Sequence, residues 1–369
     1  MKINCLKSDL IEVLNFITNA VAVKPQTQIL SGIFLNASNN QLEIQATDYS
    51  IGMLAKIPVD SQVDGKVVVL GKKFIDVIRS MPGETVTINE DSREKLLEIT
   101  SGKSKFFINT LEAEDFPKII SKDAILSFKI KAAVLKNLIK KTGFACATEE
   151  SQPIYTGCLF ESDNDKITVV ATNKHRLAMA KGSLIETTDN FRFVIPRDAL
   201  RVISEMLEES EDELIKIEYS GKKVAFTINK VFVTVRILEG DYPNYKRVIP
   251  SDSDSIITAE VSKLRSAIER VSLIAREDYN KKITFNFTSE DGLELKASSA
   301  QFGAAEETLN IEKSGQGANL AFNYIYMTDV LRVIDGEKIK VSMRGHYDPV
   351  DIREIDSDEF VYVMTPLRP

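Results

Sequence analysis

Three segments of this sequence recur three times each, in the same order and at nearly the same spacing. One of them reads LEIQATDYSIG from Leu42, ITVVATNKHRL from Ile167 and LELKASSAQFG from Leu293. The alanine shared by the three copies stands at positions 46, 171 and 297, so the spacing is 125 and then 126 residues. One amphipathic segment can resemble another by chance, but three co-ordered sets indicate a repeated structural unit. A unit of this length can form a domain with its own core.

Two further segments recur on either side of this one, and both have the apolar spacing of amphipathic helices. The preceding set reads SDLIEVLNFITNAV from Ser8, AAVLKNLIKKTGFA from Ala132 and SKLRSAIERVSLIA from Ser262. The following set reads KVVVLGKKFIDVIRSM from Lys66, RFVIPRDALRVISEM from Arg192 and NLAFNYIYMTDVLRVI from Asn319. Each copy is therefore predicted to hold a short strand, a helix and three strands, and then a shorter strand, a second helix and three more strands.

In the first copy this pattern predicts helices over Ser8–Ala22 and Lys72–Met81. Strands are predicted over Ile29–Asn36, Gln41–Thr47, Ile51–Ile57, Val67–Leu70, Thr85–Asn89, Lys95–Thr100 and Lys105–Thr110. The predicted fold class is α+β, with three tandem domains that each consist of two βαβββ-like half-units. Polar stretches near residues 121–124 and at Pro250–Ser255 place the domains at 1–122, 123–251 and 252–369.

The composition excludes several classes of protein. Hydrophobic residues make up 43% of the chain and charged residues 27%, and no apolar run reaches the length of a membrane span. The first residues lack the apolar core of a signal peptide. Three cysteines without a CxxC pair predict neither a disulfide framework nor a zinc ribbon, which favours a reducing cytoplasm. With two histidines and no HExxH motif, we expect no metal, no cofactor and no catalytic residues.

The net charge of -7 is distributed unevenly. The six predicted helical segments hold 15 Lys and Arg against 11 Asp and Glu, so the rest of the chain is more acidic than the total indicates. In the helix of the second copy, Lys136 and Lys140 lie opposite the apolar arc. A solvated helix face explains any single helix, but basic residues at repeated positions favour a lining that binds phosphates without reading sequence.

Three motifs resemble segments of the bacterial DNA polymerase sliding clamps, the beta subunits of DNA polymerase III. They are ATNKHRLA at Ala171–Ala178, EGDYPNYKRVIP at Glu239–Pro250 and VYVMTPLRP at the C-terminus. The resemblance covers the whole chain and implies a non-catalytic processivity subunit. It implies a homodimeric ring of six domains around duplex DNA, with helices lining the inside. It also implies three kinds of protein partner: the polymerase III alpha subunit, the clamp loader and other proteins with a clamp-binding motif.

In that family these motifs converge on an apolar pocket that captures short linear peptides. Carried over to this sequence, the resemblance assigns its deeper part to Thr172, His175, Arg176, Leu177, Pro243, Arg247, Val248, Val363 and Thr365. It assigns the rest to Ile154, Tyr155, Pro349, Pro366, Leu367 and Arg368. The residue types suit such a pocket, because a peptide site needs apolar walls and a few polar groups that fix direction. The sequence departs from the family at Lys174, where Gly is usual, and at Thr365, where Met is frequent.

The resemblance also suggests residues for the other contacts of a clamp. Lys24 and Lys72 match basic positions that contact DNA in the family, and to these we add Lys136, Lys140 and Arg197 from the predicted helices. For the ring interface it suggests that Phe106 and Ile108, on an edge strand, meet Leu273 and Ile274 of the other subunit. An apolar edge strand without a partner is an aggregation hazard, which gives a physical reason for pairing it between subunits.

Two other classes of function stay open at the level of sequence. One is an enzyme, for instance a hydrolase that uses His175. The other is a repetitive adhesion or interaction protein that does not bind DNA. Asp48 and Asn173 occupy equivalent positions of the repeat and Ser299 replaces them in the third copy, so a turn-forming role is favoured over a catalytic one.

Overall fold

The structure is a computed structural model, and it describes residues 1–91, 94–119, 124–149, 151–187, 189–208, 213–288, 292–355 and 357–368. The chain forms two compact units. The first unit contains Met1–Ala132, Ile185–Asp189 and Glu205–Ile237, and the second contains Ala133–Leu184, Asn190–Ser204 and Leu238–Pro369. The middle repeat contributes strands to both units. The predicted boundary near 121–124 falls mostly outside the described residues, so the three domain limits stay a prediction.

The first repeat forms the elements that its sequence predicts, with three differences. It contains β1 (Lys2–Leu6), α1 (Lys7–Ile17), β2 (Gly32–Ser38), β3 (Gln41–Thr47), β4 (Ile51–Pro58), β5 (Asp60–Val63), β6 (Gly65–Leu70), α2 (Gly71–Ser80), β7 (Thr85–Asp91), β8 (Leu96–Ser101) and β9 (Ser104–Leu111). The first helix ends at Ile17 and continues as a 3-10 turn to Ala20, and Gln28–Ser31 is another 3-10 turn where a strand is predicted. The unpredicted strand β5 is a polar edge strand beside β1, and it carries no apolar alternation that a pattern could reveal.

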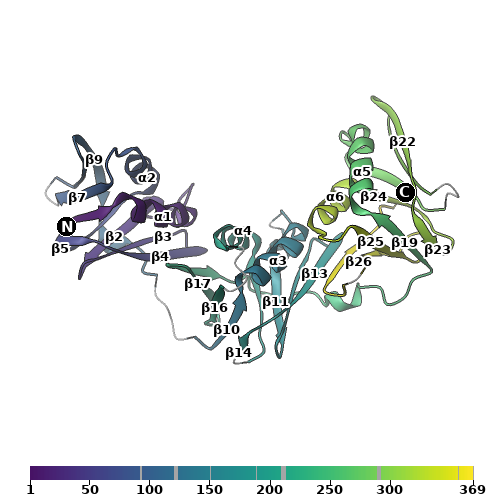
Figure 1. Cartoon of the computed structure of the whole chain (residues 1–369), viewed down its shortest axis with the longest axis horizontal. Coiled ribbons are helices and arrows are strands. Elements are labelled where there is room, and N and C mark those ends of the chain that lie inside the picture. The colour runs from purple at the N-terminus through teal and green to yellow at the C-terminus, as the bar shows by residue number, and fades with distance from the viewer. Residues whose placement is uncertain are drawn as a thin grey trace. The chain divides into compact units, whose positions relative to one another are not determined.

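A 14-stranded sheet unites the first unit, in the order β14-β10-β16-β17-β18-β4-β3-β2-β6-β9-β8-β7-β1-β5. The middle repeat supplies β10 (Leu126–Lys131), β14 (Glu186–Thr187), β16 (Leu214–Tyr219), β17 (Lys223–Ile228) and β18 (Val231–Arg236). Helix α1 packs on β3 and β4 and against α2, as the left part of Figure 1 shows. Its buried residues Leu10, Leu14 and Ile17 share one face because they are spaced three and four apart.

The second unit contains two sheets and most of the remaining helices. Its nine-stranded sheet runs β15-β11-β12-β13-β27-β26-β25-β19-β23, and its four-stranded sheet runs β22-β21-β20-β24. The strands from the middle repeat are β11 (Gly157–Asp163), β12 (Lys166–Thr172), β13 (Arg176–Ser183) and β15 (Arg192–Pro196). The third repeat supplies β19 (Ser255–Glu260), β20 (Lys282–Asn286), β21 (Leu293–Ser299), β22 (Gly303–Leu309), β23 (Glu312–Ser314), β24 (Asn319–Asn323), β25 (Lys338–Met343), β26 (Val350–Glu354) and β27 (Phe360–Met364). The helices are α3 (Ala132–Thr142), α4 (Arg197–Met206), α5 (Val261–Ala275) and α6 (Tyr324–Val333), and α5 packs against α6.

Successive repeats are joined by the same antiparallel strand pairing. In the first junction β18 pairs with β4, and Val235 lies opposite Ile51. In the second junction β27 pairs with β13, and Met364 lies opposite Arg176. Both junctions bring the last strand of one repeat to the fourth strand of the repeat before it, which is the third strand after that repeat's first helix. Under the same rule, β9 of the first repeat and β22 of the third repeat have no partner of this kind within the described part of the chain.

Candidate functional site

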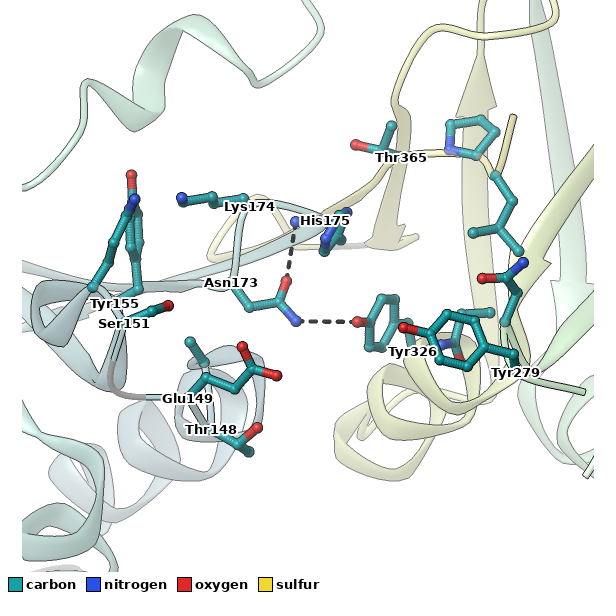
Figure 2. Close-up of a pocket in the computed structure, with 16 residues that line it drawn as sticks. Thr148, Glu149, Ser151, Tyr155, Asn173, Lys174, His175, Tyr279, Tyr326 and Thr365 are labelled. Carbon is teal, nitrogen blue, oxygen red and sulfur yellow. Dashed lines mark hydrogen bonds between the residues drawn. The ribbon is translucent and has the colours of Figure 1, made fainter. Parts of the chain in front are cut away.

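The second junction carries two neighbouring cavities in the second unit. The smaller has a volume of about 250 Å³ and is lined by Tyr155, Thr172, Lys174, His175, Arg176, Leu177, Pro243, Asn244, Tyr245, Val248, Pro349, Val363 and Thr365. The larger has a volume of about 650 Å³ and is lined by Ala147, Thr148, Glu149, Ser151, Gln152, Tyr155, Asn173, Lys174, His175, Tyr279, Asn280, Asn323, Tyr326, Thr365, Pro366 and Leu367 (Figure 2). Four residues border both: Tyr155, Lys174, His175 and Thr365. The two cavities are therefore adjoining parts of one surface depression.

The floor of the smaller cavity is the apolar core of the second junction. Leu177 of β13 and Val363 of β27 pair directly across the two strands, and both are almost fully buried. Tyr242 and Tyr245 belong to the same cluster of buried side chains. Burial raises the pKa of both phenols, so each stays a neutral hydrogen-bond donor. Tyr242 donates to the carbonyl of Val170 at 3.1 Å, which holds its ring in the core.

The turn between β12 and β13 shapes the border between the cavities. Its hydrogen bonds come from Asn173, whose Oδ1 accepts from the backbone N–H groups of His175 and Arg176 at 3.1 and 3.0 Å. Thr172 Oγ1 accepts from the N–H of Lys174 at 3.1 Å and donates to the carbonyl of Arg176 at 2.7 Å. Lys174 has a φ of 77°, in the left-handed region.

The first repeat builds the same turn from different residues. Asp48 Oδ1 accepts from the N–H groups of Ser50 and Ile51, both at 2.8 Å, and Tyr49 has a φ of 74°. In the third repeat Ser299 Oγ accepts from the N–H groups of the second and third residues after it, each at 3.3 Å. These contacts agree with the prediction that the repeated Asp, Asn and Ser form turns.

The C-terminal tail is fixed to the second unit through its backbone. The N–H of Thr365 donates to the carbonyl of His175 at 3.0 Å, and the N–H of Leu367 donates to the carbonyl of Ala321 at 2.7 Å. Pro366 between them is buried. These bonds hold a tail that would otherwise fray, and they place it along the larger cavity.

Arg176 is buried beside the smaller cavity, and its guanidinium is engaged inside the protein. Nη1 lies 2.7 Å from Oδ2 of Asp329 on α6, and Nη2 donates to the carbonyl of Phe144 at 2.5 Å. The guanidinium carbon lies 5.4 and 4.4 Å from the ring centroids of Phe144 and Tyr326. Its side chain is 8% exposed. Arg176 therefore joins β13 to α6, and its Nε–H has no hydrogen-bond partner among the residues that the structure describes.

The structure brings together most of the residues predicted for the pocket. Ten of the fifteen line the smaller cavity, and Pro366 and Leu367 line the larger one. Ile154 packs against the apolar cluster instead, while the side chains of Arg247 and Arg368 are exposed outside both linings. The sequence did not single out Asn244, Tyr245 or Tyr326. Asn244 and Tyr245 lie inside the motif EGDYPNYKRVIP, so that motif is the signal that could have identified them.

The predicted DNA-binding residues differ in how they are engaged. Lys24 follows the 3-10 turn after α1 and Lys72 lies on α2, and both are exposed. Lys140 of α3 is half-exposed but pairs with Asp335 at 2.8 Å. Arg197, at the start of α4, pairs with the adjacent Asp198 at 3.3 Å. Lys136 is partly buried on α3. Part of the positive charge counted on the helices is thus neutralised within the chain.

The neighbour of Lys140 takes part in the same network without being exposed. The Lys141 side chain is 9% exposed, and its Nζ lies 3.1 Å from Asp335 and 3.0 Å from Glu354. Burial lowers the pKa of the Lys141 ammonium, but hydrogen bonds and attraction from Glu354 and Asp335 outweigh burial and raise it overall. The pKa of Asp335 is lowered, since its contacts with the two lysines outweigh its desolvation. The network links α3 to Asp335, which follows α6, and to Glu354, the last residue of β26.

The residues predicted for the ring interface lie on two exposed edges. Phe106 and Ile108 are on β9, and Phe106 is 42% exposed. Leu273 and Ile274 are on α5, and Leu273 is 58% exposed. Among the residues that the structure describes, strand β22 beside α5 pairs only with β21, and residues 104–109 of β9 pair only with β8.

Within the described ranges, no group of three His, Cys, Asp or Glu side chains is arranged to hold a metal ion. None of the helices that the structure describes is long and apolar enough to cross a membrane.

Comparison with known protein families assigns each of the three repeats. Residues 1–120 match the N-terminal domain, residues 129–244 the central domain and residues 246–368 the C-terminal domain of the DNA polymerase III beta subunit. The chain is 30% identical to the beta sliding clamp of Bacillus subtilis strain 168 over 378 residues, which covers 100% of both chains. It is also 30% identical to the beta sliding clamp of Staphylococcus epidermidis, over 96% of each chain.

Solved structures give the same result. The sliding clamp of Bacillus subtilis matches with a TM-score of 0.96 over 100% of this chain and 99% of that one, at 30% identity. A clamp from Pseudomonas aeruginosa, solved bound to griselimycin, matches with a TM-score of 0.93 at 26% identity over 100% of both chains. The fold is the three-domain clamp fold, as the repeats predict. This chain belongs to the beta sliding clamp family, the beta subunits of DNA polymerase III, and so to the DNA-binding proteins of replication.

Proposed function

We propose that two copies of this chain close into a ring around duplex DNA and hold the replicative DNA polymerase on it. The observation that carries this proposal is the repeated strand junction. The last strand of the second and third repeats pairs with the fourth strand of the repeat before it. Strand β9 ends the first repeat and β22 is the fourth strand of the last repeat. Within the described part of the chain, residues 104–109 of β9 and the outer side of β22 are unpaired, and each is an edge of the kind that the other would fill. Two chains joined twice in this way form a closed ring of six repeats.

The two observed junctions also supply a register for the proposed one. In the second repeat, Val235 of β18 lies opposite Val224, the second residue of β17. In the first repeat, Ile108 of β9 lies opposite Leu97, the second residue of β8. Ile108 is therefore the counterpart of Val235. Val235 pairs with Ile51, whose equivalent in the third repeat is Phe302, a half-exposed residue before β22. We therefore expect Ile108 to lie opposite Phe302 of the second copy, with Leu273 of α5 covering Phe106.

DNA would be held mainly because the ring is closed around it. Exposed lysines such as Lys24 and Lys72 would contact phosphates, which gives binding without sequence preference. Lys140 and Arg197 have carboxylate neighbours within the chain, so their contribution would be smaller. Weak direct contacts suit a ring that must slide.

The paired cavities would capture short extended segments of partner proteins: the polymerase III alpha subunit, the clamp loader and others with a clamp-binding motif. Apolar side chains of the segment would fill the smaller cavity, and a preceding Gln would meet the more polar larger one. Two buried anchors contribute roughly 1.5–3 kcal/mol each before ordering costs, so we expect affinities in the micromolar range. A protein of this kind is a non-catalytic subunit, and it would work in the cytoplasm beside the chromosome.

Light scattering tests the ring interface. The wild-type chain should have twice its 41.2 kDa monomer mass. Ile274→Arg should shift it to monomer, because a charge would be desolvated at an apolar contact. Val63→Arg is the matched control, since Val63 is a half-exposed apolar residue on another edge strand, β5, and its mass should stay dimeric. A monomeric wild-type chain at micromolar concentration would rule the ring out.

A DNA retention assay tests encirclement. The clamp should be loaded by a clamp loader onto nicked circular DNA, stay there on gel filtration, and leave once the circle is linearised. Equal retention on circular and linear DNA would contradict encirclement, and absence from both would favour an interaction protein without DNA. Assaying His175→Ala for lost turnover addresses the enzymatic alternative.

A further inference from the structure

The border between the two cavities is formed by few side chains, and one of them is cationic. Tyr155, Lys174, His175 and Thr365 line both cavities. A segment that occupies both cavities must therefore pass these four residues. Figure 2 shows the Lys174 side chain extending from the β12–β13 turn toward Tyr155.

The turn fixes the backbone conformation of Lys174. Its φ of 77° is uncommon for a residue with a Cβ, and three neighbouring hydrogen bonds from Asn173 and Thr172 impose it. Tyr49 shows the same φ region at the equivalent turn of the first repeat, so the backbone geometry belongs to the fold. The turn therefore does not require a lysine at position 174, and the side chain there can have a role in binding.

Among the described residues, little offsets the positive charge of the Lys174 ammonium. Its Nζ lies 5.1 Å from the ring centroid of Tyr155, a contact worth little at an exposed site. Within the described part of the chain, the structure records no ion pair for it. The other cation of the linings, Arg176, is buried and bound to Asp329. Lys174 is therefore the cation that a bound segment would meet.

We propose that Lys174 is a specificity-determining residue that selects partner segments with an Asp or Glu between their polar head and their apolar anchors. The inference rests on the proposed peptide-binding function. A segment with its head in the larger cavity and its anchors in the smaller one has its intervening residue at the border. There a carboxylate draws the ammonium from the Tyr155 ring into an ion pair, whereas a lysine at that place is repelled.

Fluorescence anisotropy with synthetic nonapeptides tests this. The probes contain Gln-Xaa-Leu-Phe with Xaa as Asp, Asn or Lys and are otherwise identical. Wild-type protein should bind the Asp peptide about threefold to fivefold more tightly than the Asn peptide, as an exposed ion pair allows, and the Lys peptide least. In Lys174→Gln the Asp and Asn peptides should bind equally. High salt should reduce the wild-type preference but leave the Asn peptide unaffected.

Lys246→Gln is the matched control. Lys246 also lies over a tyrosine of the smaller cavity, 5.8 Å from the Tyr245 ring centroid, but its Nζ already faces Glu161 at 3.8 Å. That variant should keep the full preference for Asp. If wild-type protein binds all three peptides with the same affinity, in the micromolar range, the role of Lys174 is overturned and the peptide site stands. If no peptide binds, both are overturned.

Discussion

Arg176 and Arg332 both approach the carboxylate of Asp329, and comparing them isolates the effect of burial. Arg176 lies 2.7 Å from Asp329 with 8% of its side chain exposed, whereas Arg332 lies at 3.8 Å with 62% exposed. Replacing Arg176 by Met removes a charged hydrogen bond worth about 1.5–3 kcal/mol and a second one to the Phe144 carbonyl. It also removes two contacts with aromatic rings, at roughly 0.5–1 kcal/mol each. Methionine restores part of the packing, which lowers the sum.

We expect Arg176→Met to reduce the free energy of unfolding by about 3 kcal/mol, near the lower limit for breaking a buried ion pair. Arg332→Met should cost less than about 0.5 kcal/mol, as exposed pairs do. Urea unfolding monitored by circular dichroism measures both, and hydrogen exchange should show α6 losing protection in Arg176→Met. The double variant Arg176→Met/Asp329→Leu should recover stability, because it leaves no buried charge without a partner.

A different outcome would assign Arg176 to ligand binding instead. If Arg176→Met unfolds like wild type but binds the Gln-Asp-Leu-Phe peptide much more weakly, its guanidinium serves the ligand and the structural reasoning is wrong. Equal losses of stability for Arg176→Met and Arg332→Met would show that burial of the pair contributes nothing.

Deleting Pro366–Pro369 should abolish peptide binding in the anisotropy assay while the dimer mass and thermal unfolding stay nearly unchanged, because Pro366 and Leu367 line the larger cavity; normal binding would refute the site. Asp335→Asn should reduce unfolding stability at pH 6 by up to about 1 kcal/mol. Since the folded-state pKa of Asp335 is lowered, its contribution is present above the usual carboxyl pKa of 3.8 and is lost as pH falls through the lowered value, so the two proteins should converge in acid titrations of stability once the pH is below that lowered pKa. Lys72→Gln should reduce the salt dependence of loading onto nicked circles by about the slope of one phosphate contact, and Lys140→Gln by less, because Lys140 already pairs with Asp335; equal slopes would contradict this.

The repeat made most of the fold predictable because each apolar pattern appears three times. The two helices and most strands of the first repeat lie where periodicity predicts them. Strand β5 escaped prediction because an edge strand with polar side chains has no alternation to detect. The turn role of Asn173 was predictable, since the residues that replace it in the other repeats share only the ability to accept backbone hydrogen bonds.

The partners of charged residues were not predictable in the same way. Lys140 looked like a DNA contact from its helical face, but its carboxylate neighbour Asp335 is 195 residues away in sequence. Arg176 looked like a donor for a ligand, and its partner Asp329 is 153 residues away. Periodicity shows which side of a helix or strand a residue occupies, and it carries no information on which distant charge faces it. The sequence pattern therefore does not assign the polar roles of these charged residues.

The same strand junction occurs twice in this chain, and the residues at one position of β4 and β13 differ in a way that affects the site. Leu177 stands after Arg176 at the start of β13 and forms a wall of the smaller cavity. Its equivalent after Ile51 is Gly52, where an added Cβ would lie 2.9 Å from Oγ1 of Thr234 and 3.2 Å from Cδ1 of Ile119. In the first junction a side chain of the same chain thus occupies the space beside the strand. In the second junction the strand presents its own leucine to a cavity. The same strand junction thus occurs twice, and this substitution gives only the second one a leucine wall that the proposed partner segment would contact.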